Sequence, residues 1–94
     1  MRISLTVPGI LKDCIGGERT TQFEASTLAQ AIEFMRAQFP LLNPHLYDET
    51  GHLRRHVLLY YNDESVTWIE NWSSVLLKEG DRLQVIQAVS GGFE

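Results

Sequence analysis

The sequence lacks the features of a secreted or membrane-bound protein. Its single cysteine, Cys14, cannot form a disulfide within the chain and fits no metal-ligand spacing, so we expect a reducing compartment. No run of about 18 apolar residues occurs, so no transmembrane helix is predicted. Residues 1–10 alternate polar and apolar side chains, and their apolar stretch is too short for a signal peptide. These absences predict a cytoplasmic protein.

Positive charge is also scarce. The chain has 8 lysines and arginines against 12 aspartates and glutamates, a net charge of −4. Its basic residues are scattered apart from Arg54 and Arg55, whereas nucleic-acid binding usually needs a concentrated basic face. The histidines His45, His52 and His56 fit no metal-binding spacing. We therefore expect no nucleic-acid partner, no membrane partner, no bound metal and no catalytic residue.

The first half of the chain predicts two strands and a helix. Residues 2–7 alternate like a half-buried strand, and residues 18–25 predict an antiparallel neighbour after a wide loop over residues 10–15. Thr27 and Gln30 can form a capping box at the start of a helix that Pro40 ends. One apolar stripe runs along this helix, made of Leu28, Ala31, Ile32, Met35 and Phe39.

The second half predicts three further strands in one domain of 94 residues. They cover residues 56–61, a short stretch at 66–69, and residues 82–89, with Leu76 pointing inward between the last two. Trp68 and Trp72 are expected to anchor the packing. This order predicts an α+β fold of the β-grasp type, a mixed sheet with one main helix on one face. The first and last strands would then lie parallel in the centre of the sheet.

The chain closes on Ser90, Gly91, Gly92, Phe93 and Glu94. We expect a β-grasp domain over residues 1–89 and a flexible tail over residues 90–94, because a glycine pair loses much conformational freedom on ordering. The pair at residues 16–17 shows that this chain also uses two glycines in a plain loop. There is nevertheless a physical reason why such a tail could have a function. Glycine has no Cβ, so a glycine terminus can enter a narrow channel and present its carboxylate to a nucleotide.

Several segments along the chain together form a recognisable pattern: VPGIL (7–11), GGE (16–18), TLAQAI (27–32), VLLYYNDESV (57–66), EGDRLQVIQAV (79–89) and the diglycine. With these segments the whole chain resembles the ubiquitin-like sulfur carriers, the group of the molybdopterin synthase small subunit and the thiamine-pathway carrier. It is most similar to the branch that supplies sulfur to cysteine synthase. The resemblance implies a thiocarboxylate on Gly92, made by an E1-like adenylating enzyme that uses ATP, with no cofactor bound to the carrier. Sulfur would pass to cysteine, homocysteine or a thiolated metabolite such as a siderophore.

Two residues after Gly92 depart from the usual pattern, in which carriers end on the second glycine. Activation at Gly92 therefore requires cleavage of the Gly92–Phe93 bond, and the resemblance implies a zinc metallopeptidase of the JAMM type. The protein would then be a cosubstrate and not an enzyme. Two alternatives remain open: a modifier joined to lysines through Gly92, or an interaction module that is never processed.

A partner-binding surface is expected beside the tail. In the strand at residues 56–61, alternation places Leu58 and Tyr60 on the face opposite Val57 and Leu59. Ile86 and Ala88 of the last strand would lie next to them, forming an exposed apolar patch that partners could bind. The alternative is that the segment from residue 41 to residue 55 covers this patch.

Overall fold

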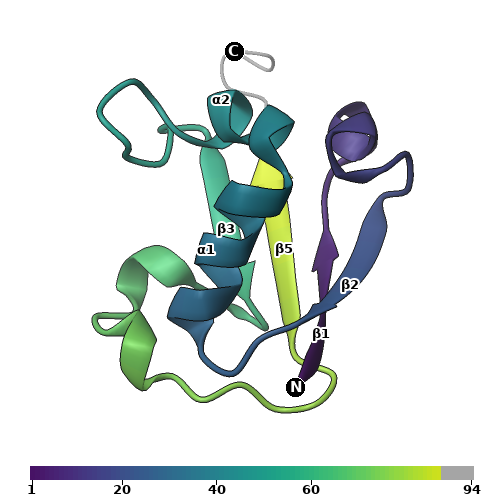
Figure 1. The fold of residues 1–94 in the computed structure, drawn as a ribbon. Coiled ribbons are helices and arrows are strands. Elements are labelled where there is room, and N and C mark those ends of the chain that lie inside the picture. Colours follow the sequence, from purple (N-terminus) through teal and green to yellow (C-terminus); the bar gives the residue numbers. More distant parts are fainter. Residues whose placement is uncertain (88–94) are drawn as a thin grey trace.

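Five strands form one sheet in the order β2-β1-β5-β3-β4 (Figure 1). The structure is a computed structural model, and it describes residues 1–87. Parallel pairing of β1 with β5 sets Leu5 opposite Leu83 in the centre of the sheet, whereas the other pairings are antiparallel. The expected mixed sheet with adjacent parallel first and last strands is therefore confirmed. The strands are β1 (Arg2–Thr6), β2 (Thr20–Glu24), β3 (Val57–Tyr61), β4 (Glu64–Ser65) and β5 (Arg82–Gln87).

The main helix α1 (Leu28–Gln38) crosses one face of the sheet (Figure 1). Its cap is Thr27, whose Oγ1 accepts a hydrogen bond of 3.1 Å from the Gln30 N–H. The return bond differs from the expected capping box, because Gln30 Oε1 accepts from the Ser26 N–H at 2.9 Å and not from Thr27. The first bond satisfies an amide of the first helical turn that has no partner within the helix, and the second ties the helix to the residue before its cap.

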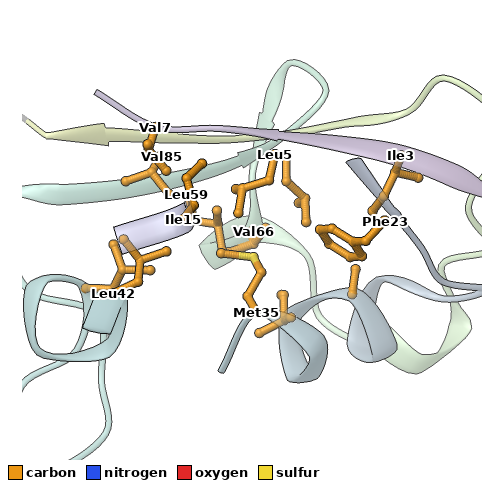
Figure 2. Close-up of a cluster of buried hydrophobic side chains, with 14 of the residues drawn as sticks. Ile3, Leu5, Val7, Ile15, Phe23, Met35, Leu42, Leu59, Val66 and Val85 are labelled. Carbon is orange, nitrogen blue, oxygen red and sulfur yellow. The ribbon is translucent and has the colours of Figure 1, made fainter. Parts of the chain in front are cut away.

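The core lies between α1 and the inner face of the sheet (Figure 2). Four members of the predicted helix stripe are buried, and the fifth, Phe39, is half-buried against the core. On the sheet side, Ile3, Leu5 and Leu59 are each no more than 1% exposed. Alternation along the strands therefore assigned the inner face correctly.

Short helices replace two segments that were predicted to be irregular or extended. Residues 10–15, expected as a loop, belong to the 3₁₀ helix η1 (Gly9–Ile15), which buries Leu11 and Ile15. Residues 66–69, expected as a strand, form η3 (Val66–Trp68), because the Ser65 Oγ accepts from the Thr67 N–H and turns the chain. The remaining short helices are η2 (Pro40–Leu42), α2 (Asn43–Leu46) and η4 (Trp72–Ser74).

Two side chains after β4 point away from the core, contrary to expectation. Leu76 is 72% exposed, whereas its neighbour Leu77 is buried. The cause is the extended backbone, in which the Leu77 N–H donates to the Ser26 carbonyl and consecutive side chains alternate. Trp68 is 78% exposed and does not anchor packing, whereas Trp72 packs against the core.

Within residues 1–87, no helix is long and apolar enough to cross a membrane.

Candidate functional site

The last strand, β5, leads directly toward the predicted tail. It lies between β1 and β3, and Gln87, the last residue that the structure describes, is opposite Val57. Residues 83 and 84 are paired on both sides, whereas residues 85–87, at the end of the strand, are paired with β3 alone. The predicted tail and cleavage residues lie outside the described part of the chain, and so does the boundary proposed between domain and tail, so these remain predictions. They are Ser90, Gly91, Gly92, Phe93 and Glu94, and Ala88 of the predicted partner-binding surface also lies outside the described residues.

Three apolar residues of β3 and β5 form an exposed patch on the open face of the sheet, called the sheet patch here: Leu58, Tyr60 and Ile86. Leu58 and Ile86 are directly opposite each other and are each 37% exposed, and Tyr60 is half-buried. Val57 and Leu59 are buried on the other face, as predicted. The outward orientation of the patch is confirmed, and its use by partners remains a prediction.

The segment from residue 41 to residue 55 does not bury this patch. Its last residues, 51–55, line a groove beside Leu58, yet both Leu58 and Ile86 keep more than a third of their surface exposed. The rest of the open face is polar, with Thr6 and Thr20 sharing a hydrogen bond of 3.0 Å between their hydroxyls. Apolar surface on this face is therefore concentrated at the end of β5, where the tail leaves.

Hydrogen bonds fix the opposite end of β5. Asp81 accepts from the Tyr61 hydroxyl at 2.6 Å and from the Lys78 N–H at 2.9 Å. Burial together with this hydrogen bond raises the pKa of Tyr61 to about 12. Burial alone would raise the pKa of Asp81, but the bonds from Tyr61, Lys78 and Asn62 outweigh it, and the pKa is lowered. The sequence signalled a turn at residues 79–81, but no local signal pairs it with a tyrosine 20 positions away.

The titratable groups singled out in the sequence are not brought together. Cys14 lies half-buried in η1, and His52 contacts the Thr50 hydroxyl through Nδ1 at 2.9 Å. Among residues 1–87, no three His, Cys, Asp or Glu side chains are arranged to hold a metal ion. Arg54 and Arg55 are exposed beside the groove. The arrangement of the described residues therefore favours presentation of a chain end and a docking surface.

Comparison with known proteins agrees with this geometry. The ThiS family model matches residues 5–92. The sulfur carrier protein CysO of Mycobacterium tuberculosis is 29% identical in a match that covers 98% of this chain and 100% of that protein. The match supports the expected resemblance to sulfur carriers over the full length.

Solved structures also match. The crystal structure of Mycobacterium tuberculosis CysO has a TM-score of 0.73 at 27% identity, and the match covers 93% of this chain and 99% of that one. A chain of the Amycolatopsis orientalis BexX/CysO complex has a TM-score of 0.73 at 28% identity, with 96% and 99% covered. These likenesses confirm the ubiquitin-like β-grasp fold.

Proposed function

Because the chain belongs to the ThiS family, we propose that it is a sulfur carrier protein, loaded as a thiocarboxylate at Gly92. Its likeness to a sulfur carrier over nearly the whole chain supports this role. In the role of carrier the protein is a cosubstrate, since the reactive group is its own main-chain carboxylate. The enzymes that act on it supply the catalytic side chains.

One observation carries the proposal: the family match ends at residue 92, on the second glycine, and leaves Phe93 and Glu94 beyond it. A carrier with this pattern becomes competent once those two residues are removed. The pairing of Gln87 with Val57 is compatible with this role, because it anchors in the sheet the last described residue before the tail. The exposed sheet patch lies beside this pair.

Three chemical steps follow. Hydrolysis of the Gly92–Phe93 amide consumes one water and leaves a carboxylate on Gly92 and an amino group on Phe93. The Gly92 carboxylate attacks the α-phosphate of ATP in an E1-like enzyme, and pyrophosphate leaves. A sulfur nucleophile then displaces AMP from the acyl adenylate and gives the thiocarboxylate. Glycine suits each step because its missing Cβ lets the backbone approach a nucleotide or a scissile-bond site closely.

Partner proteins of three kinds are proposed. They are an E1-like adenylating enzyme, a JAMM-type metallopeptidase that brings its own zinc, and an enzyme that accepts the sulfur for cysteine, homocysteine or a thiolated metabolite. The likeness to a chain of the BexX/CysO complex supports binding of a partner protein. We assign partner contact to the sheet patch, since an exposed apolar cluster next to the reactive terminus can be buried in each complex.

The proposal is tested by intact-mass measurement. The full chain is incubated with a JAMM-type peptidase, an E1-like enzyme, ATP and sulfide, and a chain ending at Gly92 is incubated without the peptidase. Both are expected to reach the mass of the Gly92 form with one sulfur in place of one oxygen. If the shortened chain gains no sulfur with an enzyme that loads another carrier, the proposal is wrong. Lysine adducts through Gly92 would instead identify a protein modifier.

A further inference from the structure

A groove of about 790 Å³ opens on the side of the molecule between α1, the segment before β3 and the segment after β4. In Figure 1 both segments lie on the same side of α1. Leu53, Leu58, Ile69 and Trp72 give the groove its accessible apolar surface, above the buried Val57 and Val66, and we call it the side groove. The Trp72 indole is held in place, because its Nε1–H donates to the Val66 carbonyl at 3.1 Å. The groove shares Leu58 with the sheet patch, and none of its lining residues takes part in the three chemical steps proposed above.

Positive charge gathers around the side groove although the protein is acidic. Arg36, Arg54 and Arg55 line it together with a single acidic residue, Glu70. Within residues 1–87 the ion pairs are Arg2–Glu24 and Arg82–Asp63, so none of the three arginines has an acidic partner there. The Arg36 guanidinium stacks 4.2 Å from the centre of the Tyr47 ring. The Arg54 Nε–H donates to the Pro44 carbonyl at 2.9 Å. These contacts hold two of the cations in place, so the groove is suited to a ligand that is both apolar and acidic.

The chain itself supplies such a ligand close by. Gln87 is paired with Val57, a residue of the groove lining, and seven more residues follow it. Six residues from Gln87 to Phe93 can span about 20 Å when extended. Phe93 offers an aromatic ring, Glu94 offers a side-chain carboxylate, and the two glycines before them permit a sharp turn. The length of the tail, the aromatic ring of Phe93 and the negative charge of Glu94 therefore all favour this dipeptide as the occupant of the side groove.

We propose that the side groove is a docking site for the Phe93–Glu94 dipeptide of the same molecule. Phe93 packs against the apolar lining near Trp72, and the Glu94 side chain pairs with Arg55. Docking is partial: a short tether supplies an effective concentration on the order of millimolar, so a contact with a dissociation constant of about 1 mM leaves about half of the molecules docked. The consequence rests on the proposed function. The docked dipeptide holds the Gly92–Phe93 bond against the protein, and its removal frees both the tail and the groove.

Trp72 reports on this docking. In a Trp68→Phe background it is the only tryptophan, and the substituted side chain is 78% exposed. Acrylamide quenching of Trp72 fluorescence is compared between the full chain and a chain ending at Gly92. Quenching in the full chain is expected to be lower by up to about half, the fraction that the docking equilibrium protects. Equal quenching in the two chains overturns the proposal.

Two charge-reversal variants show whether the protection of Trp72 depends on Arg55 or only on the net charge of the protein. Arg55→Glu should bring quenching of the full chain to that of the shortened one, whereas Lys12→Glu, the same charge change on η1, should leave it unchanged. If both variants raise the quenching of the full chain to the same extent, the Glu94 side chain does not pair specifically with the groove arginine. Protection that increases with protein concentration would show that the groove binds a second copy, which also overturns the proposal. No partner enzyme takes part, so failure here is distinct from failure of sulfur loading.

Discussion

Leu58 and Ile86 lie directly opposite each other on the antiparallel strands β3 and β5, and each is 37% exposed. Cross-strand neighbours on one face have Cβ atoms about 5 Å apart, so the two side chains form one continuous apolar surface. One residue later along β5, the described part of the chain ends. The pair therefore places an apolar surface one residue before the end of the described strand.

Ile86→Asp should impair loading while leaving the fold intact. Because the side chain is only 37% exposed and is paired with Leu58, the free energy of unfolding should fall by about 1–2 kcal/mol, which is less than the stability of a typical domain. Loss of an apolar anchor at an interface costs about 1.4 kcal/mol or more, so thiocarboxylate formation should fall about tenfold or more. The rate is measured by intact mass with the activating enzyme at subsaturating carrier.

Gln22→Asp is the matched control for this substitution. Gln22 is exposed on β2, two strands away from β5 in the sheet. Its variant should load at the rate of the unmodified protein. Equal rates for both variants and the unmodified protein would show that the sheet patch takes no part in activation.

Leu59→Ala should destabilise the protein strongly. Leu59 is 0% exposed in the middle of β3, and truncation of a buried leucine leaves a cavity, so the free energy of unfolding should fall by about 2–5 kcal/mol. Leu58→Ala on the opposite face should cost clearly less, since its side chain is already partly in water. Urea denaturation of both variants measures the difference. Similar losses would mean that the two faces of β3 are assigned wrongly.

The hydrogen bond between Tyr61 and Asp81 should make the free energy of unfolding depend on pH at both alkaline and acid pH. Tyr61 has its pKa raised from 10.0 to about 12, so its contribution is present below pH 10 and is lost as the pH rises toward about 12. Asp81 has a lowered pKa, so its contribution is present above pH 3.8 and is lost as the pH falls through the lowered value. The Tyr61→Phe variant should lack the loss of stability at alkaline pH, and its loss of stability at acid pH should be smaller than that of the unmodified protein. A variant whose denaturation profile matches that of the unmodified protein at both ends would contradict this account.

Gly92→Ala should separate folding from loading. Residue 92 lies beyond the described strands, so the melting temperature should stay unchanged. The added Cβ opposes close approach to ATP in the activating enzyme, so thiocarboxylate formation on the shortened chain should fall. A large drop in melting temperature would show that residue 92 is packed into the folded domain.

Much of this fold follows from local sequence patterns. The alternation in β1 and β3 and the stripe of α1 each bury one face against the same core, so periodicity identifies both the elements and their inner sides. The parallel pairing of β1 with β5 followed from the order of elements. The outward side chains of the sheet patch followed from the same alternation.

The short helix η3 and the burial of Leu77 in place of Leu76 could not be predicted, because contacts between distant residues decide them. Val66 has the β-branched side chain of a strand, yet its carbonyl accepts from the Trp72 indole and Ser65 caps a helical turn. Leu76 and Leu77 are equally apolar, and which of them is buried depends on the register of the Leu77 bond to Ser26. The side groove likewise depends on three separate segments meeting, which no single motif encodes.

The most direct test of the central claim is the intact mass of the protein isolated from its own cells under conditions that preserve thiocarboxylates. We predict a chain that ends at Gly92, with a fraction carrying sulfur in place of one carboxylate oxygen. A population that keeps Phe93 and Glu94 throughout, in cells that are actively transferring sulfur through this family's enzymes, would contradict the account.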